Sequence, residues 1–242
     1  MANTTRSYYM HWIWDAVFPK KCLGCQKIGC HLCQSCFKKI TFHPKLICTD
    51  CNKPLTVLAS HPTCQTNLSG LLTVGDWQDT LLKNLIYNFK YNFIKSLDIP
   101  LGKLLTRGLQ HKKFLWRNSS PLLLPVPLHP RRLRWRGFNQ AELLAKQIGQ
   151  KFDWPAINNL VIRKKHTKPQ MSIKDTGSRK KNIHAVFAIN TQQENKYLLL
   201  SKRTIFIVDD VCTTGSTLEE IASCLKHRHK NLKIYGLVLA RA

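Results

Sequence analysis

Two adjacent aspartates and the hydroxyl-rich run after them are the residues of this 242-residue chain that best suit chemistry. Asp209 and Asp210 follow residues 204–208, a β-branched and aromatic run typical of a strand buried on both faces. Open α/β sheets bind ligands at the carboxyl ends of such strands. The run after the aspartates supplies hydroxyls and backbone N–H groups at the start of a predicted helix, through Thr213, Thr214, Gly215, Ser216 and Thr217.

This arrangement predicts a site for a phosphate that is attached to a sugar. A helix N-terminus carries unpaired N–H donors and a partial positive charge, and Gly215 lets the backbone approach an anion. Asp209 and Asp210 would repel a bare phosphate but accept hydrogen bonds from hydroxyls beside it, which indicates a ribose 5-phosphate. The segment matches neither a Walker loop nor GxGxxG. A strand–turn–helix with an ordinary polar cap is the alternative.

Two segments rich in arginine and lysine carry charge that suits a phosphorylated ligand. Residues 125–140 place four arginines around Trp135, and residues 163–181 hold eight lysines or arginines. Arginine forks match phosphate oxygens, and tryptophan offers a stacking surface for a base. The second segment is predicted to be a mobile cationic loop over the site, and solvated charge is the alternative for either segment alone. The candidates for phosphate contacts are Arg131, Arg132, Arg136, Arg163 and Arg179.

Eight of the ten cysteines lie in the first 64 residues, which in a reducing compartment indicates metal ligands rather than disulfides. Three Cys-x2-Cys pairs precede one His-x2-Cys pair, so two closed, structural zinc sites are predicted. Sequential pairing is preferred, and a crossed pairing of the first pair with the third stays open. Cys30 is an extra thiol that could replace a neighbour, and Cys212 and Cys224 are predicted packing residues. The predicted ligands are Cys22, Cys25, Cys33 and Cys36 in one site and Cys48, Cys51, His61 and Cys64 in the other.

The rest of the chain alternates strands and helices, which predicts an α/β fold with a mainly parallel sheet flanked by helices. Helical periodicity covers residues 80–111, and further helices are predicted to begin near Asn139 and Ser216. Glu142 and Glu219 lie three residues after those starts and are predicted capping partners. Apolar runs predict strands at 122–127, 204–208 and 234–239.

The composition predicts a cytoplasmic protein with a cationic surface. Lys and Arg number 38 and Asp and Glu 13, so the formal charge is +25, or about +22 with seven thiolates on two Zn²⁺. That sign attracts polyphosphates and nucleic acid. Neither a signal peptide nor stable membrane insertion is expected, because no cleavage motif and no apolar run of roughly 18 residues is present. The expected parts are an aromatic segment at 1–19 with a helix at 12–18, a zinc-ribbon module at 20–66, a polar joint at 66–70 and an α/β domain at 71–242.

The stretch around the two aspartates resembles the phosphoribosyl-diphosphate (PRPP) signature of type I phosphoribosyltransferases. The match consists of the apolar run, the two acids and Thr-Thr-Gly-Ser-Thr, and Cys212 stands where that family usually has an aliphatic residue. The resemblance implies the type I phosphoribosyltransferase fold for residues 71–242. It also implies that Asp209 and Asp210 are catalytic and hold the ribose hydroxyls, that residues 213–217 hold the 5-phosphate, and that Mg²⁺ binds with PRPP.

Further motifs are similar to those of the ComF family of competence proteins over nearly the whole chain. Arg-Gly-Phe-Asn-Gln at 136–140 follows Pro-Val-Pro at 125–127. A later family segment is matched by Gln170, Arg179 and Asn182. Paired cysteines precede the PRPP signature as in that family, although the family has Cys-x2-Cys where this chain has His61 and Cys64.

The ComF resemblance implies a role in natural transformation, in which the protein handles incoming single-stranded DNA and meets a helicase-like competence protein. An active PRPP-dependent phosphoribosyltransferase, acting on an unidentified nucleobase or amine, is the alternative. A zinc-stabilised adaptor for the helicase is a third interpretation. A cationic groove with exposed aromatic rings binds single strands with little sequence preference. The candidates for DNA contacts are Arg134, Trp135, Phe138, Lys164, Lys165, Lys180 and Lys181.

Overall fold

The computed structural model describes residues 19–55, 61, 63–119, 121–164, 186–196 and 204–242. The helix expected at 12–18 lies outside these residues, as does most of the predicted cationic loop. Lys165, Arg179, Lys180 and Lys181 therefore lie outside the described residues. In the part of the chain that is described, no helix has the length and apolar character needed to cross a bilayer.

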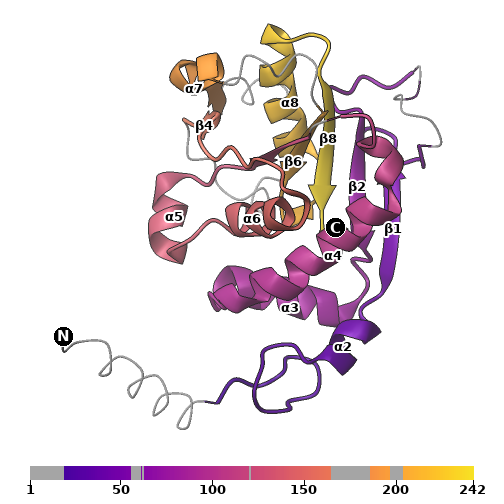
Figure 1. Cartoon of the computed structure of the whole chain (residues 1–242), viewed down its shortest axis with the longest axis vertical. Coiled ribbons are helices and arrows are strands. Elements are labelled where there is room, and N and C mark those ends of the chain that lie inside the picture. The colour runs from indigo at the N-terminus through magenta and orange to yellow at the C-terminus, as the bar shows by residue number, and fades with distance from the viewer. Residues whose placement is uncertain (1–18, 56–60, 62, 120, 165–185, 197–203) are drawn as a thin grey trace, which may run out of the picture.

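A five-stranded sheet lies at the centre of the described structure, in the order β1-β2-β8-β6-β3. Figure 1 shows β1, β2, β8 and β6 following one another across this sheet. Neighbouring strands from β2 to β3 are parallel, and β1 joins the edge in the antiparallel sense. The predicted α/β fold with a mainly parallel sheet is confirmed. The strands are β1 (Phe42–Ile47), β2 (Gly70–Gly75), β3 (Leu122–Pro125), β6 (Thr204–Val208) and β8 (Lys233–Val238).

Alternate residues of the sheet face two separate cores. Phe206 and Val208 of β6 contribute to the core shared with α3, α4 and α6. Ile205 and Ile207 contribute to the core shared with α8. All five residues of β6 are buried, as the unbroken apolar run predicts. These helices are α3 (Thr80–Tyr91), α4 (Asp98–His111), α6 (Gln140–Phe152) and α8 (Ser216–Arg228).

Shorter elements complete the described chain. β4 pairs with β5 in the antiparallel sense, and β7 pairs with β9 in the parallel sense. The helical pattern predicted over 80–111 is interrupted after α3, where Phe93 adopts a left-handed φ of 54°. The short elements are α2 (Gln34–Lys39), η1 (Lys95–Leu97), η2 (Lys113–Leu115), α5 (Pro130–Arg136), β4 (Val161–Arg163), β5 (Phe187–Ile189), α7 (Thr191–Lys196), β7 (Val211–Cys212) and β9 (Ala240–Arg241).

The cysteine-rich region is built into the sheet, because β1 comes from it and pairs along β2. Residues 66–70, expected as a polar joint, are packed. Leu68 is buried, and the N–H of Ser69 donates to the carbonyl of Ile234 at 2.6 Å. A Cβ at Gly70 would lie 2.9 Å from Leu55 and 3.0 Å from Leu46, so the backbone approaches the ribbon closely there.

Candidate functional site

The two aspartates lie directly after β6, which is flanked on both sides by parallel strands. The chain then passes through β7 and residues 213–217, here called the phosphate loop, into α8. Gly215 has a φ of 83° and occupies the N-cap position, where a side chain would be strained. Thr213 and Thr214 are exposed, and Ser216 and Thr217 are half-buried. The loop therefore offers hydroxyls and a helix N-terminus at the carboxyl edge of the sheet.

The capping box predicted for α8 from Ser216 and Glu219 is wrong. Ser216 is already the first helical residue, and Gly215 caps the helix without a side-chain hydrogen bond. The carbonyl of Gly215 instead accepts from the N–H of Glu219 at 2.9 Å. At α6 the prediction is confirmed: the Asn139 side chain accepts from the N–H of Ala141, and its amide donates to Glu142.

The Glu219 side chain connects α8 to the cysteine-rich region. Its carboxylate accepts hydrogen bonds from the hydroxyls of Thr49 and Thr66 and, at 2.7 Å, from the N–H of Asn67. Thr49 follows Cys48, a predicted zinc ligand, and its carbonyl accepts from Arg241 at 3.2 Å. Donors from distant residues thus hold the Glu219 carboxylate in place of a local cap, so the segment beside the second predicted zinc site and the first turn of α8 share one hydrogen-bond network.

A lysine that the sequence analysis missed is paired with the second aspartate. Lys90 Nζ on α3 lies 2.8 Å from Asp210 Oδ1, and the two side chains are only 21% and 7% exposed. Burial alone would lower the pKa of Lys90, but the Asp210 carboxylate outweighs it and raises that pKa. Lys90 therefore stays charged and neutralises part of the acid pair.

The sequence carried one signal for Lys90. The buried residues of α3 include Leu82 and Ile86, which are four residues apart, and Lys90 lies four residues further on the same side of the helix. A lysine that continues a buried stripe needs an acidic partner. The partner lies 120 positions further along the chain, so spacing alone does not identify it.

The pKa of Asp209 is raised to about 7 by burial and by the neighbouring Asp210 charge, against the opposing effect of Lys90. The N–H of Asp210 donates to Asp209 Oδ1 at 2.8 Å. A carboxyl group that titrates near neutrality suits proton transfer or a change of charge on ligand binding.

We expect Asp209→Asn to stabilise the protein increasingly as pH rises. The folded state holds the Asp209 proton up to about pH 7, whereas the unfolded aspartate ionises near pH 4, so wild-type stability falls across that window. Asparagine has no charge to desolvate. The stability gap between variant and wild type should widen by about 1–2 kcal/mol between pH 5.5 and 7 and then stay level. Thermal unfolding of both zinc-loaded proteins at each pH measures it, and a gap independent of pH would contradict the raised pKa.

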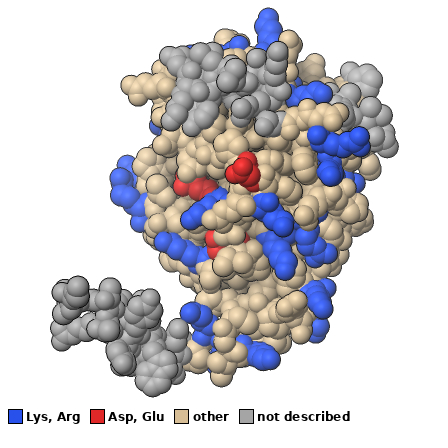
Figure 2. All heavy atoms as spheres, in the orientation of Figure 1, with Lys and Arg blue, Asp and Glu red and all other residues tan. Residues whose placement is uncertain are grey.

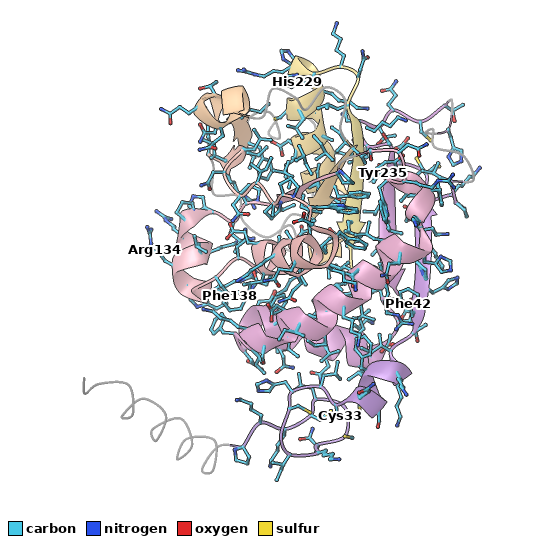
Figure 3. The ribbon with its side chains drawn as sticks, in the orientation of Figure 1. Cys33, Phe42, Arg134, Phe138, His229 and Tyr235 are labelled. Atoms are coloured by element: carbon cyan, nitrogen blue, oxygen red, sulfur yellow. The ribbon has the colours of Figure 1, made fainter. Side chains whose placement is uncertain are left out.

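Two of the predicted arginines, Arg136 and Arg163, lie within electrostatic reach of the acid pair. Arg136 is half-buried, and burial lowers its pKa while the Asp210 charge opposes that shift. Burial and the Arg132 charge lower the pKa of Arg163, and the charges of Glu220 and then Asp209 oppose that shift. Arg131 and Arg134 are exposed on α5, and Arg134 points away from the body of the molecule (Figure 3). Figure 2 shows basic side chains spread over this face around a few acidic ones.

Phe138, a candidate DNA contact, was predicted to be exposed, and that exposure is wrong. It is 7% exposed, and its ring centroid lies 5.7 Å from that of Phe89. Gly137 ends α5 in a left-handed conformation, and the chain then turns into the core. Trp135, one residue before the end of α5, is 59% exposed as predicted.

The cysteine-rich region gathers two sets of four potential metal ligands. Within each set, the ligand atoms all lie within 4.8 Å of one another. This grouping is the sequential one, not the crossed alternative. Four soft thiolate or imidazole donors fit a structural zinc ion with no open position. The sets are Cys22, Cys25, Cys33 and Cys36, and Cys48, Cys51, His61 and Cys64.

Backbone donors favour thiolates in both sets. The N–H of Cys33 donates to Cys22 Sγ at 3.3 Å. Burial alone would raise the pKa of Cys22, but this and other backbone N–H groups lower it to about 6. A backbone N–H of Lys53 lowers the pKa of Cys51 to about 7. Cys30 belongs to neither set, and Cys212 is buried in the core, where burial raises its pKa to about 11.

The fold and these clusters define a mixed α/β protein with an N-terminal structural zinc ribbon. Residues 13–67 match a family model described as a double zinc ribbon domain. The chain is 32% identical to competence protein F of Haemophilus influenzae, over 92% of this chain and 98% of that protein. It is 30% identical to the DNA utilization protein YhgH of Escherichia coli over 80% of this chain and 83% of that protein. It is 29% identical to competence protein ComFC of Bacillus subtilis over 95% and 89% respectively. The chain belongs to this competence protein F and ComFC family.

Proposed function

We propose that the protein takes part in natural transformation, handling incoming single-stranded DNA in the cytosol on a scaffold that binds PRPP. The names of its relatives, competence protein and DNA utilization protein, support a competence role. The observation that carries the PRPP part is the acid pair before the phosphate loop, with Lys90 in contact and Arg136 and Arg163 in electrostatic reach.

In this proposal, three groups of residues each bind a different part of PRPP. The phosphate loop binds the 5-phosphate through backbone N–H groups and hydroxyls. Asp209 and Asp210 accept hydrogen bonds from the ribose hydroxyls. The pyrophosphate is bound by Arg132, Arg136 and Arg163 from the described chain, with Arg131 and Arg179 as further candidates. Mg²⁺ fits the hard oxygen donors present here and, bound with PRPP, would neutralise part of the pyrophosphate charge.

The alternative function is catalysis, a phosphoribosyl transfer to a nucleobase or amine. The pKa of Asp209, raised to about 7, favours it because catalytic carboxyl groups are often tuned to this range. The acid pair and the arginines would stabilise a developing oxocarbenium ion and the leaving pyrophosphate. Incubation with PRPP, Mg²⁺ and a panel of nucleobases and amines separates the functions, since only an active enzyme releases pyrophosphate.

The DNA part of the proposal predicts salt-sensitive retention of single strands. Lys and Arg outnumber Asp and Glu by 25, and Arg131, Arg134 and Lys164 are exposed. With three phosphates neutralised, affinity for an oligonucleotide should fall about 20-fold between 50 and 200 mM salt. Fluorescence anisotropy of the zinc-loaded protein measures this fall. A sample that does not retain the oligonucleotide at 50 mM salt would contradict DNA handling. Co-purification with the helicase-like competence protein tests the expected partner.

A further inference from the structure

Four exposed aromatic side chains form one continuous patch between the end of α3 and α5. The ring centroids of Tyr87 and Tyr91 are 4.9 Å apart, those of Tyr91 and Trp135 6.4 Å, and those of Trp135 and Phe93 5.2 Å. The four side chains are 55%, 46%, 59% and 38% exposed in the order Tyr87, Tyr91, Trp135, Phe93. We refer to these four residues as the aromatic platform.

The exposure of the four platform rings to water is unfavourable in free energy. Large aromatic side chains gain free energy when they leave water, so a contiguous exposed group of four marks an interaction surface. Phe93 also holds a left-handed φ of 54°, a conformation unfavourable for a bulky residue. Backbone outliers of this kind persist where the surroundings impose them and are concentrated at functional sites.

Charge around the platform selects an anionic occupant. Residues 80–97 and 130–141 contain no aspartate or glutamate. The Arg136 guanidinium lies 5.5 Å from the Tyr91 ring centroid and 5.8 Å from that of Trp135. Arg131 and Arg134 are exposed on the same short helix as Trp135. Rings with flanking arginines are the combination that binds unpaired bases and their phosphates together.

Ring orientation favours bases over a flat apolar partner. The interplanar angles along the platform are 42°, 58° and 86°, so the rings are tilted rather than stacked on one another. Ring faces that are not stacked on each other remain open to a base. Duplex DNA keeps its bases stacked internally and has no free faces to offer, so the geometry fits single strands.

The platform adjoins the acid pair through two residues. Tyr91 follows Lys90, whose Nζ contacts Asp210 at 2.8 Å. Arg136 touches two platform rings and is acted on by the Asp210 charge. A strand on the platform would therefore lie near the acid pair.

We infer that the aromatic platform is a base-stacking subsite for single-stranded nucleic acid, in which bases lie on Tyr87, Tyr91, Phe93 and Trp135 and phosphates contact the arginines of α5. The inference rests on the proposed DNA function and adds to it a role for α3. It assigns base contacts to the rings and charge contacts to the arginines, so the two contributions are separable by experiment.

The test compares a single-stranded oligonucleotide with an abasic one of the same length, at several salt concentrations, using the full-length zinc-loaded protein. Tyr87→Ala and Trp135→Ala should each weaken binding of the base-bearing strand about 5- to 100-fold and leave abasic binding and the salt slope unchanged. Trp135→Phe, which keeps a ring, should restore much of the affinity. Arg134→Gln should instead weaken both strands and make the salt slope shallower.

The outcomes separate this inference from the proposed function. If the wild type binds neither strand, the DNA function itself is contradicted. If the wild type binds in a salt-sensitive manner but does not distinguish base-bearing from abasic strands, only the platform is contradicted. Equal losses of both strands in Trp135→Ala, or duplex binding as tight as single-strand binding, would also overturn it. Both alanine variants remove exposed side chains, and unchanged thermal unfolding would exclude misfolding as the cause.

Discussion

Replacing Cys51 with serine is expected to lower the unfolding temperature by at least about 10 °C. We expect it to destabilise both the zinc ribbon and the phosphate loop. Cys51 Sγ lies 3.1 Å from His61 Nδ1 in the second cluster. Structural zinc contributes roughly 10–16 kcal/mol in small zinc-binding peptides, and about 3–5 kcal/mol lost here already gives that shift. Zinc content and thermal unfolding of the variant measure the effect.

The matched control is Cys30→Ser, because Cys30 is a thiol of the same cysteine-rich region but belongs to neither cluster. It should keep both zinc ions and the wild-type unfolding temperature. Glu219→Gln separates the ribbon from the loop. It replaces the carboxylate that accepts hydrogen bonds from Thr49, Thr66 and Asn67 with a neutral amide, and it leaves the zinc ligands intact. It should retain zinc but bind PRPP more weakly. Unchanged stability of a zinc-free Cys51→Ser protein would contradict a structural role for the metal.

Replacing Lys90 with methionine is expected to destabilise the protein by about 3–5 kcal/mol. The substitution leaves the Asp210 carboxylate, which is 7% exposed, without its ion-pair partner. Methionine keeps a side chain of similar length, so little packing is lost. Chemical denaturation of the zinc-loaded protein measures the change in the free energy of unfolding.

A double-mutant cycle provides the control for this pair. Lys90→Met made in an Asp210→Asn background should cost much less than in the wild type, because no buried charge is then left unpaired. Lys90→Arg should keep most of the stability, since it preserves the charge. If Lys90→Met costs the same free energy in both backgrounds, the 2.8 Å contact contributes no coupling and the acid pair is not held as described.

Local sequence patterns were sufficient to predict the main architecture. The apolar run at β6 and the alternation of strands and helices predicted the parallel sheet, and the cysteine spacing predicted the ligand sets that the fold brings together. These features depend on residues that are close together in the sequence, and they could therefore be predicted from it.

Features that depend on distant parts of the chain could not be predicted in the same way. Glu219 has the spacing of a capping residue, but donors from Thr49 and Thr66 compete for its carboxylate. Lys90 gains its partner only when α3 packs near the end of β6. Phe138 follows a run of arginines and looked exposed, yet the left-handed turn at Gly137 brings it into the core.

The central claim is that the acid pair and the phosphate loop bind PRPP, and calorimetric titration of the zinc-loaded protein with PRPP and Mg²⁺ tests it most directly. The wild type should release or absorb measurable heat and should unfold at a higher temperature with the ligand. The double variant Asp209→Asn with Asp210→Asn, checked for folding, should show neither effect. A wild-type titration with no heat and no rise in unfolding temperature would contradict the claim.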